Sequence, residues 1–325
     1  MEKIKFAILA PGGIANCMAE AVNQIEEIEC YAVASRSYER AKNFADKWGF
    51  QKAYGSYEEM AEDPQVELVY VASPHSHHYP YAKLCLEHGK HVLLEKAFTV
   101  NAMQAEELIT LARSKGLLLA EAFWPRYMPS RKIIDDLIAR GAIGEVHSVV
   151  ADFGAPLTHV ERLSNPALAG GALLDLGVYP LNFALTIFTG EVQDIQSSAV
   201  MSPQGVDWMN GITLTFEGGK MAVLHSNMLA YMDNRGVIYG DKGYIEMGDL
   251  NNCSKIHVYD ENKKMTACYP VPEQINGYEY EAIACVRAIR AGQVECPEMP
   301  HSETLRLMKI LDAVRKQWGF TLPCE

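Results

Sequence analysis

The sequence predicts an α/β protein with an N-terminal doubly wound parallel sheet and a C-terminal α+β domain that contains a large, mostly antiparallel open sheet. Three observations lead to this prediction. Residues 1–123 alternate short apolar runs with amphipathic segments, as parallel strands joined by crossover helices do. Residues 124–325 contain longer strand-like runs separated by glycine-rich hairpin turns. The length of 325 residues is ordinary for two domains.

The expected strands of the first half are short apolar runs, at 4–10, 30–35, 52–54, 66–73, 91–95 and 117–123. Amphipathic segments separate them and predict helices at about 14–25, 37–49, 77–89 and 102–116. Two of these helices stop at a glycine, Gly49 and Gly89, which is a common C-terminal signal. The order of these segments is that of repeated βαβ units.

The second half begins with a predicted helix at 129–144 and continues into hairpins. Turn signals lie at Gly218-Gly219, at 241–243 and within 255–271. Helices near 274–291 and 301–318 close the chain. We expect the antiparallel sheet to be open on one face and to bury that face in a homodimer or higher homo-oligomer.

The composition is that of a globular protein, with 49% hydrophobic and 22% charged residues. A net charge of −12 disfavours nucleic acid and anionic membranes as partners, because both require a basic surface. No apolar stretch approaches the length of a membrane span, and the N-terminus does not read as a signal peptide. Together with eight scattered cysteines and no C-x-x-C, these features predict a cytoplasmic protein with reduced cysteines.

The turn after the first strand, "ILAPGGIA", is similar to the dinucleotide fingerprint G-x-G-x-x-G/A. Alanine replaces the first glycine, the central glycine is kept, and a small residue ends the pattern. A simple glycine-containing turn from strand to helix is the alternative, but the turn opens a βαβ unit, which favours phosphate binding. We expect the cofactor to contact Ala10, Gly12, Gly13, Ile14 and Ala15.

The end of the second strand, "VASRSYER", indicates which nicotinamide cofactor binds. An NAD site usually has an acid here for the ribose 2′-hydroxyl, whereas this chain has Ser35, Arg36 and Arg40. A guanidinium suits a 2′-phosphate, so NADP is preferred and NAD remains possible. The alternative is that both arginines are ordinary surface cations.

Polar residues follow two other strands of the predicted sheet. Glu95 and Lys96 end the run "HVLLEK", and "SPHSHHY" follows the strand at 66–73. Ligands bind beyond the carboxyl ends of parallel strands, so we expect both stretches to line the cofactor site. A surface ion pair is the alternative for Glu95 and Lys96. The candidate cofactor contacts here are Ser73, Pro74, His75, His78, Glu95 and Lys96.

Two further patterns were considered for chemistry. Asp175 and Tyr179 in "GGALLDLGVYP" are four residues apart, so a helix would place them on one face. Taken alone, this pattern is more typical of a helix with a capping aspartate and an amphipathic tyrosine. His75, His77 and His78 cluster in sequence without a Glu-x-x-His or Cys/His pair, so no metal site is expected.

Taken together, the chain resembles the Gfo/Idh/MocA family of NAD(P)-dependent oxidoreductases over nearly its whole length. The segments that carry the resemblance are "VASRS", "VYVASPHSHHY", "HVLLEKAF", "EAFWPRYMP", "IGEV" and "GGALLDLGVYPL". "LLEKAF" is similar to the family's E-K-P, and "DLGVY" to its D-x-G-x-(Y/H). A tyrosine rather than a histidine at 179 makes the chain resemble most the branch of the family that acts on dihydrodiols and D-xylose with NADP.

The resemblance implies an N-terminal Rossmann domain, residues 1–123, and a substrate-binding and oligomerisation domain, residues 124–325. It implies that Lys96 is the catalytic lysine and that Asp175 and Tyr179 are the other catalytic residues. It also assigns to the substrate pocket Trp124, Arg126, Phe153, Asp175 and Tyr179. The substrate class implied is a sugar, polyol or vicinal diol.

Two positions depart from the family pattern. Ala97 stands where the family has proline, which leaves open whether the Lys96–Ala97 bond is cis or trans and how the lysine is aimed. Ala10 stands at the first glycine of the fingerprint and bears on cofactor affinity.

The cofactor carries the hydride, so the protein must handle the proton. Tyr179 is the candidate acid/base, with an ordinary tyrosine pKa of about 10 that a nearby ammonium lowers. Lys96 would supply that ammonium, or the two roles are exchanged; Asp175 orients a substrate hydroxyl or fixes Lys96. Two rival hypotheses are a non-catalytic NAD(P)-binding sensor on the same fold and an NAD-dependent inositol-type dehydrogenase. The presence of all three residues favours the enzyme, and the absence of histidine at 179 and of an acid near 35 disfavours the inositol type.

Overall fold

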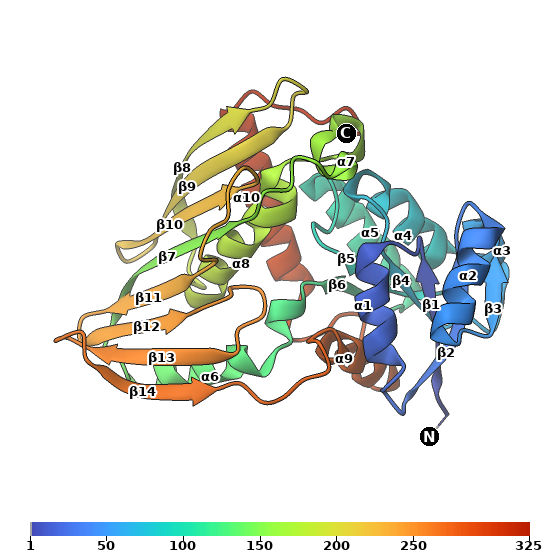
Figure 1. The fold of residues 1–325 in the computed structure, drawn as a ribbon, viewed down its shortest axis with the longest axis horizontal. Helices are drawn as coiled ribbons and strands as arrows, with labels where there is room; N and C mark the ends of the chain where they lie inside the picture. The colour runs from blue at the N-terminus through green and yellow to red at the C-terminus, as the bar shows by residue number, and fades with distance from the viewer. Residues whose placement is uncertain (1) are drawn as a thin grey trace. The chain divides into compact units, whose positions relative to one another are not determined.

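The computed structural model describes residues 2–325, and internal contacts divide the chain into two compact units (Figure 1). The first unit extends to Tyr127 and includes the later segment Gln274–Met308. The second unit comprises Met128–Glu273 and Lys309–Glu325. The sequence predicts one boundary at 123/124, whereas the segment 274–308 packs with the N-terminal part of the chain.

The first unit is built on a six-stranded sheet in which every neighbouring pair is parallel. The strand order is β3-β2-β1-β4-β5-β6, the order of a doubly wound dinucleotide-binding sheet. Central strands such as β4 are buried along their whole length, because helices cover both faces of a parallel sheet. The strands are β1 (Ile4–Leu9), β2 (Ile28–Ala34), β3 (Lys52–Tyr54), β4 (Leu68–Val71), β5 (His91–Glu95) and β6 (Leu119–Ala122).

The helices of the first unit begin and end where the sequence places capping residues. Ser37 accepts the backbone N–H of Arg40 at the start of α2, and Gly49 ends that helix with a φ of 75°. The α-helices are α1 (Gly13–Val22), α2 (Tyr38–Trp48), α3 (Tyr57–Glu62), α4 (His78–Glu87), α5 (Ala102–Lys115) and α9 (Glu279–Arg290); α10 (His301–Gln317) begins in this unit. Short 3₁₀ turns are His75–His77 and Trp124–Arg126. No sequence pattern predicted α3.

Strands β1 and β4 are adjacent in the sheet. From β1 the sheet continues through β2 to β3 on one side, and from β4 it continues through β5 to β6 on the other, so the strand order reverses between β1 and β4. Ligands of doubly wound sheets bind beyond the carboxyl ends of the strands at such a point. Residues 10–15 follow β1, and residues 73–78 follow β4. The fold of this unit therefore brings the two predicted cofactor segments to the same end of neighbouring strands.

The second unit is built on an eight-stranded sheet of order β14-β13-β12-β11-β7-β10-β9-β8. All neighbouring pairs are antiparallel except β7 and β10, which run parallel. The three predicted hairpins are β9–β10, β11–β12 and β13–β14. The strands are β7 (Val146–Gly154), β8 (Val192–Met201), β9 (Asp207–Phe216), β10 (Lys220–Asn227), β11 (Gly236–Gly240), β12 (Gly243–Met247), β13 (Lys255–Asp260) and β14 (Met265–Pro270).

Helix α8 (Val178–Ile187) packs on β7 and β10 and covers one face of this sheet (Figure 1). The other helices of the unit are α6 (Pro129–Ala139), α7 (Glu161–Ser164), a 3₁₀ turn Pro166–Leu168 and a π-helical turn Leu173–Gly177 that continues into α8. The helical stretch Pro166–Ile187 is long and apolar enough to cross a membrane, which corrects the sequence expectation. Its most apolar window is 94% buried, as in a core helix of a globular protein.

Glu121 on β6 makes the stability of the first unit depend on pH. It is 2% exposed, and burial raises its pKa to about 7, although Thr304 donates a hydrogen bond to it. The pKa in the unfolded chain is near 4.5, so the folded state holds this proton more tightly. The resulting stability is fully present below pH 4.5 and is lost as the pH rises to 7.

We expect Glu121→Gln to unfold like the parent chain at pH 4.5 and to be more stable by about 3 kcal/mol at pH 8. Urea denaturation at both pH values measures the difference. Glu39→Gln on the exposed surface of α2 is the control and should change neither value. An equal effect of Glu121→Gln at both pH values would show that folding does not shift the pKa of this carboxyl.

Candidate active site

The turn after β1 keeps the backbone shape of the dinucleotide fingerprint although its first glycine is replaced. Ala10 has a φ of 66°, in the left-handed region that glycine adopts most easily. Gly12 is the N-cap of α1, no side chain caps the helix, and its first turn contains no acid. The first backbone N–H groups of α1 are therefore left for an anion such as a pyrophosphate.

Neither the backbone conformation nor a close contact within the protein requires glycine at position 12. Its φ of −119° is one that any L residue adopts. A Cβ built on Gly12 would meet only the Ala10 carbonyl oxygen at 3.9 Å, and one built on Gly13 would meet nothing within 4 Å. The space beside the turn is open, as close approach of a pyrophosphate to the backbone requires, so the residues present fit a dinucleotide.

Gly12→Ala should separate folding from cofactor binding. We expect the free energy of unfolding to change by less than about 0.5 kcal/mol, because the weaker cap and the stiffer unfolded chain offset each other. The added methyl group should raise the Kd of both NADPH and NADH by about 10- to 100-fold, the effect of overpacking by 1–3 kcal/mol. Urea denaturation and fluorescence titration measure the two quantities. Unchanged cofactor affinity would mean that the turn does not contact the pyrophosphate.

The residues after β2 form a cationic corner with aromatic rings. Arg36 and Arg40 are exposed, while Ser35 is buried and its backbone N–H donates to the Tyr54 carbonyl. Burial raises the pKa of Tyr57, and the positive charges of Arg36 and Arg40 oppose that rise, which places both guanidinium groups near this ring. A guanidinium pair at this strand end fits an adenine ribose that carries a 2′-phosphate.

The loop after β4 is fixed by His78 rather than left open. His78 is 1% exposed, and its ring nitrogens lie 2.8 Å from the carbonyl oxygens of Ala97 and Ser73. Burial lowers the pKa of His78 to about 4, and a neutral ring donates a hydrogen bond to one of these two carbonyls. His78 thereby ties the β4 loop to the chain that carries Lys96. Of its neighbours, His75 is also buried and Pro74 is partly exposed.

Lys96 follows the buried end of β5, where a carboxylate organises the backbone. Glu95 is 7% exposed and accepts a hydrogen bond from the Tyr70 hydroxyl on the neighbouring strand. The Lys96 backbone N–H donates to the same carboxylate at 3.2 Å. The Lys96–Ala97 peptide bond is cis, which answers the question left open by the alanine in this motif. Lys96 itself is partly exposed.

Trp124 and Arg126 lie in the 3₁₀ turn after β6 and have partners in the same unit. The Trp124 ring stacks on Tyr278 with centroids 4.4 Å apart. Arg126, whose side chain is 9% exposed, donates to Glu303 at 3.0 Å. Both residues are thus held against the segment that the sequence placed in the second domain. Their predicted contact with substrate stays a prediction.

In the second unit, Asp175 lies in the π-helical turn and Tyr179 in the first turn of α8. Both are buried, at 6% and 8% exposure. The Phe153 ring at the end of β7 packs against the Tyr179 ring at a centroid distance of 4.7 Å. The fold therefore brings Phe153 to Tyr179, as expected of residues of one pocket. π-Helical turns within α-helices frequently mark functional positions.

Two residues of this region were missed by sequence reasoning. Arg162 donates from Nη1 to the Asp175 Oδ1 atom at 2.9 Å. Asp207, 2% exposed, accepts the Leu173 backbone N–H at 2.9 Å and the Asn210 side-chain amide at 2.8 Å. No sequence pattern marks either residue, because Arg162 and Asp175 are separated by irregular chain, and Leu173 and Asp207 by α8 and β8.

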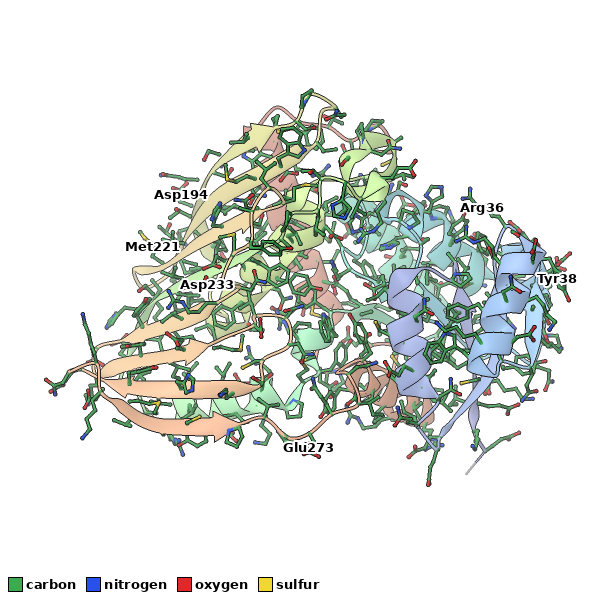
Figure 2. All side chains as sticks on the ribbon, viewed as in Figure 1. Arg36, Tyr38, Asp194, Met221, Asp233 and Glu273 are labelled. Carbon is green, nitrogen blue, oxygen red and sulfur yellow. The ribbon has the colours of Figure 1, made fainter. Side chains whose placement is uncertain are left out.

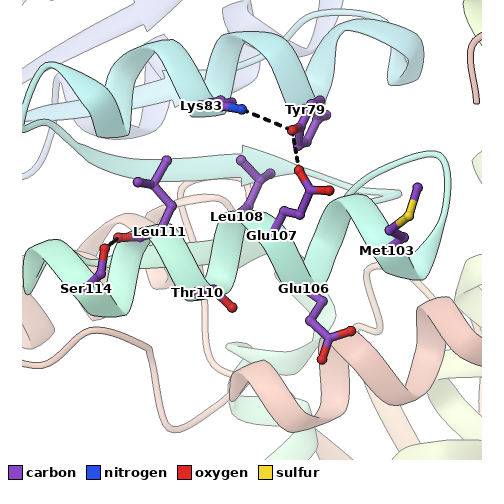
Figure 3. Close-up of a pocket in the computed structure, with 9 residues that line it drawn as sticks. All are labelled: Tyr79, Lys83, Met103, Glu106, Glu107, Leu108, Thr110, Leu111 and Ser114. Atoms are coloured by element: carbon purple, nitrogen blue, oxygen red, sulfur yellow. Dashed lines mark hydrogen bonds between the residues drawn. The ribbon is translucent and has the colours of Figure 1, made fainter.

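No group of three His, Cys, Asp or Glu side chains in residues 2–325 has the arrangement of a metal site. The His77 ring stacks on Tyr81 at 5.5 Å instead. A groove of about 570 Å³ lies between α4 and α5, where Lys83 donates to the Tyr79 hydroxyl and that hydroxyl to Glu107 (Figure 3). The residues that line this groove include none of the predicted site residues.

Sequence comparison finds two family matches in the chain. Residues 4–123 match the oxidoreductase family with an NAD-binding Rossmann fold, Gfo/Idh/MocA. Residues 132–246 match the Gfo/Idh/MocA C-terminal domain. Together they cover the parallel sheet of the first unit and, in the second, the strands β7 to β11 and most of β12.

Individual relatives extend these matches over nearly the full length. Trans-1,2-dihydrobenzene-1,2-diol dehydrogenase of Macaca fascicularis is 39% identical over 308 residues, 91% of each chain. The enzyme of the same name from Homo sapiens is 37% identical over 306 residues, again 91% of each chain. A 3-ketoreductase of Actinomadura kijaniata, solved with NADP, has a TM-score of 0.88 at 28% identity and covers 97% of this chain and 98% of its own. An aldose–aldose oxidoreductase of Caulobacter crescentus has a TM-score of 0.89 at 23% identity, with 98% of both chains covered, which shows the shared fold.

Proposed function

We propose that this chain, which belongs to the Gfo/Idh/MocA family of oxidoreductases, is an NADP-dependent enzyme that moves a hydride between a nicotinamide and a carbon bearing a hydroxyl group in a vicinal diol or sugar. One observation carries this conclusion. Lys96, Asp175 and Tyr179 lie in the segments "LLEKAF" and "DLGVY", which resemble the family's motifs, in a chain 39% identical to a diol dehydrogenase over 91% of its length. A sensor that only binds the cofactor would not need these three residues.

Relatives support the two catalytic residue types. The 3-ketoreductase of Actinomadura kijaniata has been solved with its cofactor as variants in which a lysine is replaced by alanine or glutamate, and a tyrosine by phenylalanine. The positions changed in that protein are separated by nearly the same number of residues as Lys96 and Tyr179 in this chain. We therefore assign the proton chemistry of this chain to Lys96 and Tyr179.

The cofactor supplies the hydride acceptor or donor, and residues of this chain bind it and handle the proton. The turn at Gly12 and Gly13 would hold the pyrophosphate, and Arg36 with Arg40 the 2′-phosphate. Tyr179 takes the hydroxyl proton during oxidation and returns it during reduction. Lys96 is the other residue that we assign to proton handling, either as an ammonium that binds the reacting oxygen or as the group that transfers the proton itself. Asp175 accepts a hydrogen bond from a substrate hydroxyl.

The decisive experiment has two steps. NADPH and NADH are titrated into the protein by fluorescence, and a panel of vicinal diols and sugars is then followed at the absorbance of the reduced cofactor. We expect tighter binding of NADPH and turnover of at least one diol or aldose. Tight NADPH binding with no turnover of any compound in either direction would favour the non-catalytic sensor.

We further propose that the chain forms a homodimer through the sheet face that α8 does not cover. Strand register places Val150, Met221, Val223 and Tyr239 on this face, each 39–46% exposed. Figure 2 shows Met221 and Asp194 on the side of the sheet away from α8. An apolar sheet face of this kind is commonly buried against a partner.

Val223→Glu should therefore shift the sedimentation coefficient to that of a monomer, while Glu217→Gln at the β9–β10 turn should not.

The remaining expectations concern the cellular location of the protein and its binding partners. A cytoplasmic location is supported by the eight cysteines, all of which are unbridged. The net charge of −12 supports a small-molecule partner rather than nucleic acid or an anionic membrane.

A further inference from the structure

The carboxylate of Asp175 has a defined cationic partner within its own unit. Arg162, on the short helix α7, donates from Nη1 to the Asp175 Oδ1 atom at 2.9 Å. The Asp175 side chain is 8% exposed, whereas that of Arg162 is 46% exposed. A buried carboxylate needs such a partner, and the guanidinium keeps further N–H groups toward solvent.

Two glycines fix the distance between α7 and the π-helical turn. A Cβ on Gly170 would lie 2.4 Å from the Leu163 carbonyl oxygen and 2.8 Å from that of Arg162, so only glycine allows this approach. The Gly171 backbone N–H donates to the Leu163 carbonyl at 2.9 Å, and the φ of Gly171 is 119°. The chain just before Asp175 is therefore packed directly on the carbonyls of α7, the helix that carries Arg162.

The other side of the π-helical turn is anchored by Asp207. It accepts the backbone N–H of Leu173, two residues before Asp175, and a Cβ on Gly171 would lie 2.3 Å from the Asp207 Oδ1 atom. The backbone around Asp175 is thus held between α7 and β9. The orientation of the Asp175 side chain is left to the groups that bond to its oxygens, and Arg162 is one of them.

The ion pair is not explained by stability alone. Because the Asp175 carboxylate is buried, loss of Arg162 would remove the charged partner of a buried group, so the pair also contributes to folding. In addition, a planar guanidinium fixes the direction of a carboxylate far better than water does. Arg162 can therefore determine how Asp175 is presented as well as stabilise it.

We infer that Arg162 is a positioning residue that holds Asp175 in the orientation in which its second oxygen accepts a hydroxyl of the diol or sugar. This inference rests on the proposed function, because that function places Asp175 among the substrate contacts. The Arg162–Asp175 pair then sets the preference for a vicinal diol over a monohydric alcohol, since only the diol has a second hydroxyl to donate.

The test compares five variants with trans-cyclohexane-1,2-diol and cyclohexanol as substrates. Arg162→Met should lower kcat/KM for the diol by about 10- to 100-fold, the effect of losing a charge-assisted hydrogen bond, with less effect on cyclohexanol. Arg162→Lys should retain more activity than Arg162→Met, and added guanidinium chloride should restore part of the loss in Arg162→Met. NADPH binding by fluorescence should be unchanged in both.

Arg235→Met is the matched control, because the Arg235 side chain is 47% exposed and pairs with Asp233 and Glu246 in the same unit. It should retain the activity of the parent chain. Asp175→Asn, alone and combined with Arg162→Met, completes a double-mutant cycle, and the second change should add little to the first.

The outcomes separate the inference from the proposed function. Parent-like kinetics in Arg162→Met with a large loss in Asp175→Asn would overturn the positioning role and leave the function intact. Parent-like kinetics in both would remove Asp175 from the substrate site and with it that part of the proposed function. Equal losses on the diol and on cyclohexanol in Arg162→Met would overturn the proposed selectivity.

Discussion

Replacing Lys96 by methionine is expected to lower kcat on the order of 10³-fold, within the range that a positioned acid or base contributes. The side chain keeps its length and apolar stem but loses the ammonium. Stopped-flow or steady-state rates with the best substrate of the panel measure the loss. NADPH should still bind, because the pyrophosphate turn and the cationic corner after β2 are untouched, and fluorescence titration checks this.

The structure offers a close control for this variant. Lys83 on α4 is a partly exposed lysine of the same unit and bonds to the Tyr79 hydroxyl, in a groove lined by none of the predicted site residues. Lys83→Met should retain the parent rate. Parent-like kcat in Lys96→Met would end the proposed mechanism, whereas loss of both NADPH binding and turnover would assign Lys96 to cofactor binding instead.

Replacing Arg36 by leucine should change which cofactor the protein prefers. We expect the Kd of NADPH to rise by about 10- to 100-fold, the value of charge-assisted hydrogen bonds to a phosphate. The Kd of NADH should stay within a factor of about 2, since NADH has no 2′-phosphate for the guanidinium to bind. Fluorescence titration with both cofactors measures the two constants on one sample.

Salt dependence and a second arginine sharpen this test. The affinity of the parent chain for NADPH should fall as ionic strength rises, and Arg36→Leu should flatten that dependence. Arg113→Leu, a change at an exposed arginine of the same unit that pairs with Glu295, is the control and should leave both constants unchanged. Equal weakening of NADPH and NADH by Arg36→Leu would show that the arginine does not read the 2′-phosphate.

Much of the fold follows from apolar periodicity. The strands β1 to β6 lie within two or three residues of the predicted runs, because buried parallel strands are short and almost wholly apolar. Helix α3 was missed although Ser56 accepts the Glu59 N–H, a capping arrangement that the sequence "SYEE" contains. At six residues, α3 was too short for helical periodicity to show.

The candidate site was predicted less completely, and the reason is physical. Motif positions such as Lys96 and Tyr179 can be predicted from the sequence because the residues that define each motif are close together in the chain. Partners that depend on tertiary packing cannot, as the Arg162–Asp175 pair and the tie from His78 to Ala97 show. The packing of 274–308 with the N-terminal part was missed for the same reason, since no local pattern records which surface a distant helix covers.

The central position of β7 has a consequence for how the chain is made. Both neighbours of β7 in the sheet, β10 and β11, are encoded at least 60 residues later, from Lys220 onward. During synthesis both edges of β7 therefore remain unpaired until the π-helical turn, α8, β8 and β9 have been translated. Fragments that end before residue 220 lack both partners, so they should be captured by chaperones or aggregate rather than accumulate as half-sheets.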